Sequence, residues 1–308
     1  MSQKITATFK VVTPMFMSGA DQGKAELRLP SVKGALRFWW RALAWGRLNG
    51  NIQHIREEEA KLFGSTDKGQ AAVLMKILDQ ELSTEKQEKW SQNRWEAYVG
   101  YGLIETTGGD SRQYIKPGGT FTLSLRSKNS LPDGGEGLEK SLLSLGLLGG
   151  LGGRSRKGWG SVNLTSLNGA LAWSPPTGPE ELETALNTLL GNHDGQPSYT
   201  AVSSASEIET GEPQRSAVEA HKYLADRYKD SVRGVDNKRE REQFGLPRKG
   251  NNQRRASPIF LHVHELPDGK AIPVATYLPA RFLEKQAKPT GGDKHIQSFL
   301  GKMAGGMQ

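Results

Sequence analysis

The chain has 308 residues, a formal net charge of +8 and no cysteine, with 37 glycines and 15 prolines. Its apolar and charged fractions are those of a folded protein, which excludes global disorder. No apolar stretch reaches the length of a membrane-spanning helix, about 20 residues, and the first residues lack the apolar block of a signal peptide. The lack of cysteine excludes disulfides and thiolate metal sites. We therefore expect a soluble, cytoplasmic protein with no membrane partner, whose positive charge favours polyanions.

The first 170 residues alternate between strand and helix patterns. Apolar and polar residues alternate over Lys4–Val12, which predicts a strand. Ser31 is a suitable N-cap for a helix that ends near Leu48. The next predicted elements are a helix over Arg56–Phe63, strands over Ala71–Leu78 and Gly119–Arg126, a helix over Gly137–Leu148 and a strand over Trp159–Leu167. This order is that of a ferredoxin-like, or RRM-like, domain, in which helices cover one face of an antiparallel sheet.

A proline-rich linker, Ser174–Pro179, precedes the second half. There we predict a helix over Glu180–Leu190, a strand near Tyr199–Ile208, a helix from Pro213 to Val232, and strands over Ile259–Val263 and Pro273–Tyr277. The tail after Thr290 is expected to be partly mobile. Because 308 residues are long for one hydrophobic core, the sequence predicts an α+β protein with two ferredoxin-like domains with antiparallel sheets, 1–173 and 174–308. The second would carry a basic insertion around 233–255.

Positive charge is clustered along the chain. Arg227–Arg255 holds ten basic residues against four acidic ones, and Lys24–Arg47 holds six against one. Clustered cations suit phosphate neutralisation, which releases counterions from a nucleic acid. Charge runs also occur as solvated helix faces, so charge alone leaves both interpretations open.

The first predicted helix carries a basic stripe. Lys33, Arg37 and Arg41 are spaced by four residues and therefore lie along one line of the helix. Four residues rise about 6 Å, close to the spacing of successive phosphates in a single strand. Gly34, in the predicted first turn, costs roughly 1 kcal/mol against alanine, which suits a ligand backbone approaching the free N–H groups there. The alternative is a core helix with a basic outer face.

The segment 149–160 is a glycine-rich turn between a predicted helix and a predicted strand. Glycines allow main-chain N–H groups to point at phosphate oxygens, and the cations of this loop add charge. The loop matches neither a Walker A motif nor a dinucleotide fingerprint, so nucleotide-dependent chemistry is disfavoured. The alternative is a flexible basic loop whose glycines serve turn geometry. The predicted contact residues are Arg154, Arg156, Lys157, Gly158 and Trp159.

Catalytic groupings are sparse. The six histidines form no H-E-x-x-H motif, and the nucleophile elbow of serine hydrolases is absent. His262 and His264 share one face of a strand without a carboxylate at metal-ligand spacing. Asp21 is a lone aspartate in a glycine turn, a position that is usually structural. We predict no catalytic residue, no metal and no cofactor.

The block Pro30–Leu43 carries a resemblance to a known family. Together with the two short motifs before it, Gly19–Asp21 and Glu26–Arg28, it resembles the N-terminal signature of the CRISPR RAMP (repeat-associated mysterious protein) superfamily. Within that superfamily it is similar to the first-subunit family of type III-B (Cmr) effector complexes. Further matches, in the same order along the chain, are Leu62–Ser65, the glycine-rich loop Gly149–Gly160 and Arg254–Pro258.

The resemblance implies two RRM-like domains and a non-catalytic role in antiviral defence. The subunit would bind CRISPR RNA near its 3′ end within a ribonucleoprotein, beside other RAMP subunits, and target RNA is a further candidate partner. The RRM stacking motif is missing, so base stacking on the sheet is not assumed. The resemblance also adds Arg254 and Arg255 to the predicted RNA contacts.

Two alternatives stay open. The first is a RAMP endoribonuclease, in which Asp21 acts with a metal or His54 acts as general base. Asp21 occupies a loop comparable to the one whose aspartate serves cleavage in backbone RAMP subunits, but the first subunit is not expected to cut. The second is a structural adaptor whose basic surfaces meet acidic proteins.

Overall fold

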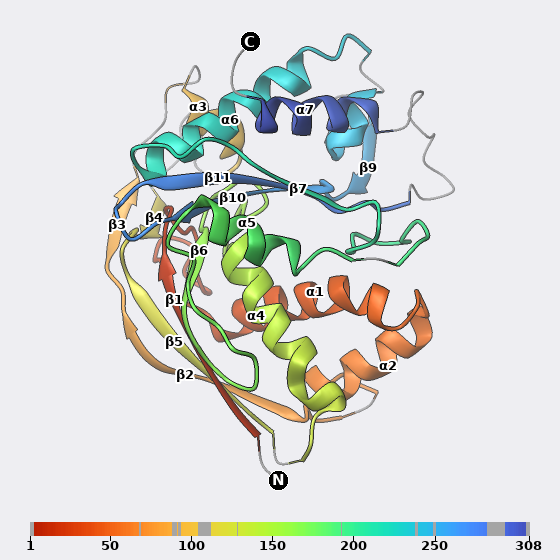
Figure 1. Cartoon of the computed structure of the whole chain (residues 1–308). Coiled ribbons are helices and arrows are strands. Elements are labelled where there is room, and N and C mark those ends of the chain that lie inside the picture. Colours follow the sequence, from red (N-terminus) through yellow and green to blue (C-terminus); the bar gives the residue numbers. More distant parts are fainter. Residues whose placement is uncertain are drawn as a thin grey trace.

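The computed structural model describes residues 3–67, 69–87, 91, 94–103, 112–127, 129–191, 193–237, 240–248, 251–281 and 293–305. Over these residues the chain forms two main antiparallel sheets with helices packed between and outside them (Figure 1). No helix of the described part is long and apolar enough to cross a membrane.

The first sheet has the ferredoxin-like strand order predicted from the sequence. Its strands are β1 (Gln3–Val11), β2 (Val73–Glu81), β5 (Thr120–Ser127) and β6 (Val162–Asn168). They lie in the order β2-β5-β1-β6, and every neighbouring pair is antiparallel. The alternation in β1 buries Ile5, Ala7, Phe9 and Val11 on one face. Helices α1 (Leu29–Arg47) and α4 (Glu136–Leu148) cover that face (Figure 1).

The start of α1 differs from the prediction. The helix begins at Leu29 with Arg28 at the N-cap, so Ser31 as the N-cap is wrong. Pro30 fits the first turn because proline lacks the N–H that would be left unbonded there. Gly34 therefore lies in the second turn, where N–H groups bond within the helix. The expectation of free N–H groups at Gly34 is therefore wrong, while contact of a ligand with Gly34 stays a prediction.

Between α1 and β6 the chain carries elements that the sequence analysis shortened or missed. Helix α2 is longer than predicted because Asn51 caps it, accepting a hydrogen bond from the N–H of His54. The other elements in this part of the chain are short or exposed, so the sequence shows no clear periodicity of apolar residues there. The bounds are α2 (Ile52–Phe63), β3 (Thr84–Gln87), α3 (Trp95–Val99), β4 (Arg112–Ile115) and the short turn η1 (Pro132–Gly135), and β3 pairs with β4.

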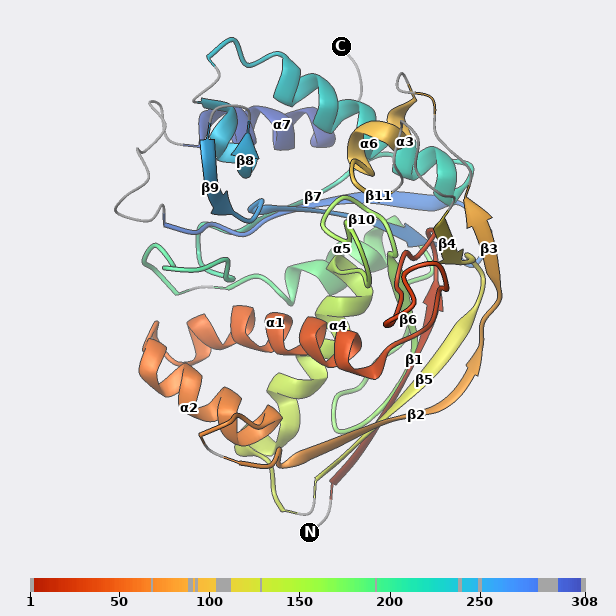
Figure 2. The same cartoon turned by 180° about the vertical axis from the view of Figure 1, so that it is seen from behind.

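The second sheet is three-stranded among the described residues. It consists of β7 (Glu207–Thr210), β10 (Ile259–Glu265) and β11 (Ala271–Tyr277), in the antiparallel order β10-β11-β7. Helices α6 (Ala217–Arg233) and α7 (Lys294–Ala304) cover the face away from α1 and α4 (Figure 2). The chain order β7, α6, β10, β11, α7 follows a ferredoxin-like unit. The remaining elements are α5 (Pro179–Asn187), η2 (Glu240–Phe244) and the paired strands β8 (Leu246–Arg248) and β9 (Asn251–Arg255).

Several predictions for the second half are wrong. The strand near Tyr199–Ile208 is irregular up to residue 206. Pro213 lies outside α6, since Ser216 caps that helix by accepting from the N–H of Glu219. Within the tail expected to be mobile, 293–305 carries a docked helix with four buried apolar side chains. These are Ile296, Phe299, Leu300 and Met303 of α7. The division of the chain after residue 173 stays a prediction.

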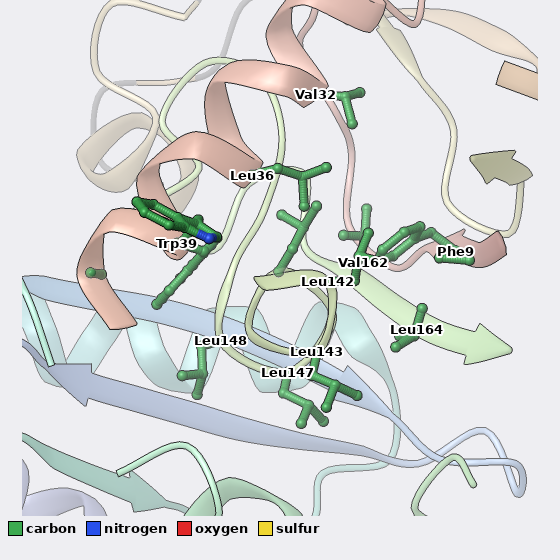
Figure 3. Packing of buried hydrophobic residues seen from close by; sticks show 14 of the residues in the cluster. Phe9, Val32, Leu36, Trp39, Leu142, Leu143, Leu147, Leu148, Val162 and Leu164 are labelled. Atoms are coloured by element: carbon green, nitrogen blue, oxygen red, sulfur yellow. The ribbon is translucent and has the colours of Figure 1, made fainter. Parts of the chain in front are cut away.

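Helix α4 lies between the two sheets. Eleven of its thirteen residues are buried, and three of these, Glu139, Ser141 and Ser144, are polar. Figure 3 shows Leu142 among side chains of α1 and β6, while Leu147 and Leu148 point toward the strands of the second sheet. One hydrophobic cluster accordingly joins Leu142 to Val274 of β11. Packing on α4 thus ties both sheets into one core.

The glycine-rich loop Gly149–Gly160 makes a second connection between the sheets. The hydroxyl of Thr13, after β1, donates to the carbonyl oxygen of Gly158 at 2.6 Å. On the other side, the N–H of Leu261 in β10 donates to the carbonyl oxygen of Arg156 at 3.1 Å. Gly158 has φ +82°, and a Cβ there would lie 2.8 Å from the His221 ring. The loop is therefore a packed part of the core, which requires glycine at this position.

Three buried histidines lie around this loop. His221 of α6 contacts the carbonyl oxygen of Lys157 at 2.8 Å, and Nδ1 of His262 contacts that of Gly149 at 2.7 Å. Burial lowers the pKa of both imidazoles to about 4. Burial, together with the neighbouring His262, lowers the pKa of His264 to about 3. His262 and His264 do share one environment, as predicted, but both side chains are buried.

We predict opposite stability effects at two glycines. Gly34→Ala should raise the free energy of unfolding by about 0.5–1 kcal/mol, because position 34 is exposed and helical and leaves open space for a methyl group. Gly158→Ala should lower it by about 1–3 kcal/mol, because of the positive φ and the nearby His221 ring. Urea unfolding measures both. A Gly158→Ala protein as stable as the wild type would contradict the packed loop.

We also predict that the protein loses stability as the pH falls below about 6.5. The unfolded chain then binds protons on His221, His262 and His264 that the folded chain binds only near pH 4 or below. The free energy of unfolding should fall by about 1.4 kcal/mol per pH unit for each histidine between roughly pH 6 and pH 4.5. His264→Met, which does not titrate, should reduce this slope by about one third. Equal stability at pH 7 and pH 5 would contradict the assignment.

Candidate nucleic-acid interface

A cleft of about 490 Å³, here called the main cleft, lies between α1, the loop after β1 and the glycine-rich loop. The main chain of Gly149–Gly153 forms part of its wall. Among the described residues that line it, two are arginines and none carries a carboxylate. The lining residues are Phe16, Met17, Ser18, Gln22, Ser31, Ala35, Phe38, Trp39, Arg112, Gly149, Gly150, Leu151, Gly152, Gly153, Ser155, Arg156 and Phe260. An open cleft of this charge suits an anionic ligand.

Arg112, at the start of β4, is a cation of the main cleft that the sequence analysis missed. Its guanidinium donates to the hydroxyl of Ser18 at 3.3 Å and to the carbonyl oxygen of Leu103 at 3.4 Å. Its buried Nε–H has no hydrogen-bond partner. No carboxylate of the described chain forms an ion pair with it, so its charge is available to a ligand. In the sequence, Arg112 stands only in a short polar segment before Pro117, and nothing in that segment indicates that its side chain lines a cleft.

Two of the three cations in the predicted stripe of α1 are held by an internal carboxylate. Arg37 donates through Nε to Oε1 of Glu59 at 2.9 Å, with a second contact at 2.8 Å. Arg41 reaches Oε2 of Glu59 at 3.4 Å. Glu59 is only 4% exposed, and removing both arginines would leave its charge buried and unpaired. Arg37 and Arg41 of the stripe therefore take part in the packing of α1 on α2.

Lys33 differs from the two arginines that follow it. It is partly exposed, and within the described ranges no acidic group lies at ion-pair distance from its ammonium group. Lys33 is therefore the residue of the stripe whose charge is not already used by the fold.

The three cations of the glycine-rich loop point to different places. Arg154 is exposed, and its Nε donates to the carbonyl oxygen of Tyr101 at 2.7 Å. Lys157 lies over the Tyr228 ring of α6, with 3.5 Å between its Nζ and the ring centroid. Arg156 turns toward α1 and β10. The loop therefore presents no continuous basic patch.

Arg156 sits on two aromatic rings. The central carbon of its guanidinium lies 4.4 Å from the centroid of Phe260 and 5.1 Å from that of Phe38. It also donates to the carbonyl oxygen of Ser257. Burial lowers its pKa to about 10, so the group remains charged at neutral pH. Such stacking holds the guanidinium in place through cation–π attraction.

The other predicted contact residues have mainly structural positions. Gly158 is buried against His221, and Trp159 is 3% exposed and stacks on Trp95, with 6.1 Å between ring centroids. Arg255 donates to the carbonyl oxygens of Gln243 and Ala280. Burial lowers its pKa. Gly158 and Trp159 are therefore buried and have no exposed surface for RNA. The guanidinium of Arg255 is held by main-chain carbonyl groups of the second half of the chain.

Arg254 belongs to strand β9 by its backbone, and its side chain lies outside the described part.

A second cleft of about 430 Å³ adjoins the main cleft along α1. Phe38 and Arg156 line both clefts and therefore stand between them. The other lining residues of the second cleft are Arg41, Ile52, Ile55, Arg56, Glu59, Ser198, Tyr199 and Thr200. Nothing in the sequence indicates this cleft, because residues 198–200 reach α1 from a distant irregular segment.

The residues of the enzymatic alternative are engaged in local contacts. A side-chain oxygen of Asp21 accepts from the N–H of Gly23 at 2.9 Å, and the other lies 3.8 Å from Nζ of Lys24. His54 pairs with Glu58 one helical turn away, at 3.3 Å. Among the residues that could be searched, no three acidic or histidine side chains gather where they could hold a metal ion.

The chain is similar in sequence to a known protein and similar in fold to two solved structures. A protein of Pyrococcus furiosus named CRISPR system Cmr subunit Cmr1-2 is 32% identical over 178 residues, 51% of this chain and 93% of the relative. The crystal structure of apo Cmr1 from the same organism has a TM-score of 0.68 at 24% identity, covering 96% of this chain and 97% of that one. The cryo-EM structure of the Type III-B Cmr-beta bound to cognate target RNA has a TM-score of 0.63 at 12% identity, covering 98% and 99%.

These two structural likenesses, at identities below 25%, concern the fold. The family rests on the sequence: the model of the RAMP superfamily matches residues 8–163, and the Cmr1 relative is matched over nearly its whole length. The chain belongs to the RAMP superfamily, as the motifs around α1 and the glycine-rich loop predicted.

Proposed function

We propose that this chain is a non-catalytic RNA-binding subunit of a type III-B (Cmr) CRISPR ribonucleoprotein. The observation that carries the proposal is the main cleft, whose described lining holds Arg112 and Arg156 and no carboxylate. A single RNA strand lies in it, with phosphates near Arg112 and the main chain of Gly149–Gly153. Phosphate contacts of this kind position a strand without reading its sequence.

The family supports the choice of ligand and partners. The matched relative is named as a Cmr subunit, and a solved structure of the same fold is described as bound to cognate target RNA. By analogy, CRISPR RNA near its 3′ end is the expected ligand, target RNA is a further one, and other RAMP subunits are the neighbours. The net charge of +8 is consistent with a polyanionic partner.

The revised set of phosphate contacts differs from the one predicted from sequence. Lys33, Arg112 and Arg154 carry charges that form no ion pair with described carboxylates. Arg37 and Arg41 share Glu59 and contribute a net charge of about one between them. We therefore expect Lys33, Arg112 and Arg154 to make most of the contacts with the RNA phosphates.

We predict that Arg112→Gln weakens binding of single-stranded RNA by the isolated chain and flattens its salt dependence. One lost phosphate contact should reduce the slope of log K against log salt by roughly 0.7. Fluorescence anisotropy with labelled RNA across a salt series measures this slope. Arg126→Gln is the matched control, because Arg126 is an exposed arginine on a first-sheet strand and does not line the main cleft. An equal slope change in both variants, or none in Arg112→Gln, would refute the main cleft as the RNA site.

The endoribonuclease alternative makes a different prediction for Asp21. For a non-catalytic subunit, Asp21→Ala should leave target cleavage by the assembled complex unchanged, because its carboxylate makes local contacts with Gly23 and Lys24. Cleavage products are compared on a sequencing gel at equal amounts of intact complex. Loss of one cleavage site with the complex intact would assign catalysis to this loop.

A further inference from the structure

The second cleft has the mixed apolar and polar lining of a site for a partly apolar ligand. Its lining combines the apolar side chains of Ile52, Ile55 and Phe38 with the hydroxyl groups of Ser198 and Thr200. A volume of about 430 Å³ lies within the range of small-molecule sites, which combine an apolar lining with a few polar groups. This cleft differs from the main cleft in having a carboxylate, that of Glu59, among its lining residues.

The wall shared by the two clefts is an aromatic and guanidinium surface. The ring of Phe38 is partly exposed, and it packs on Phe260 with 5.4 Å between centroids. The Arg156 guanidinium lies over both rings. Unstacked RNA bases bind to aromatic rings and to arginine planes. A strand whose phosphates lie in the main cleft can therefore place one base past this wall.

Glu59 gives the second cleft a hydrogen-bond preference. Its Oε1 accepts from Arg37 at 2.9 and 2.8 Å, whereas Oε2 has only a contact with Arg41 at 3.4 Å. An ionised carboxylate offers about four lone-pair sites, so Oε2 keeps room for another donor. The Tyr199 hydroxyl already donates to the carbonyl oxygen of Arg41 at 2.9 Å. The anionic acceptor in this cleft is therefore suited to an amino group.

We propose that the second cleft is a nucleobase subsite that takes one unpaired base carrying an exocyclic amino group. The base stacks on Phe38 and Arg156, and its amino group donates to Glu59. Uracil presents a carbonyl oxygen in place of the amino group of cytosine, and this oxygen would face a carboxylate without a proton between them. The inference rests on the proposed function, because the RNA backbone reaches the subsite through the main cleft.

Binding of short labelled oligo(C) and oligo(U) to the full chain tests the subsite. The two polymers have the same backbone and ring size. Cytosine carries an amino group at position 4 where uracil carries a carbonyl oxygen, and uracil carries a proton on N3 where cytosine carries none. Oligo(C) should bind about tenfold more tightly, at the lower end of the discrimination expected for a good base contact. Glu59→Gln, whose amide both donates and accepts, should bring this ratio close to one. Equal affinity of the wild type for both polymers would overturn the assignment of Glu59.

Phe38 variants test the stacking independently of Glu59. Phe38→Leu should weaken binding of both polymers by about tenfold without changing the salt slope, because no phosphate contact is lost. Phe38→Tyr keeps the ring and should bind like the wild type; thermal melting checks that each variant is folded. Unchanged affinity in Phe38→Leu would overturn the subsite. If Arg112→Gln still flattens the salt slope in that case, the main cleft survives and only the subsite fails.

Discussion

The close packing of the glycine-rich loop is the constraint on which the rest of this structure depends. Its carbonyl oxygens accept hydrogen bonds from Thr13 after β1 and from Leu261 of β10, so the loop joins the two sheets through main-chain contacts. A side chain at position 158 would press against the His221 ring of α6 and displace the loop. Because the loop is fixed on both sides, Gly149–Gly153 can form a rigid wall of the main cleft. The glycines therefore allow the close packing of the loop, and the shape of the cleft wall follows from that packing.

Most of the positive charge that the sequence displays near the cleft is used inside the protein. Arg156 is held by two aromatic rings, Lys157 by Tyr228, and Arg37 and Arg41 by Glu59. Cations held in this way keep their charge but have fewer donors for a ligand. Clustering of charge along the sequence therefore does not show which individual cations are free for a ligand, and the RNA contacts predicted from it stay predictions. A cation that no carboxylate holds, such as Arg112, is recognised only when its surroundings are known.

The first sheet could be predicted because its strands alternate clearly and its helices are strongly apolar, as in β1 and α4. The prediction failed where tertiary contacts replace local signals. Helix α7 has buried residues at helical spacing, but glycine-rich flanks hid it. The strands β3 and β4 are short and polar: β3 buries no residue and β4 buries only Ile115, so neither shows an apolar alternation. Glu59 illustrates the limit for the site: nothing in α2 indicates that one of its three consecutive glutamates will be buried under arginines of α1.

The pairing of Glu59 also bears on how an acidic residue can belong to an RNA site. A free carboxylate beside a phosphodiester strand would repel it, since like charges a few ångströms apart cost free energy. Arg37 and Arg41 together outweigh the charge of Glu59, so the local field stays positive while the acceptor atoms remain. In the proposed function this arrangement separates two tasks. The main cleft supplies cations to the backbone, and the second cleft supplies an acceptor to a base, with Phe38 and Arg156 between them. A paired A-form duplex keeps its bases stacked inside, so such a division of contacts selects unpaired RNA.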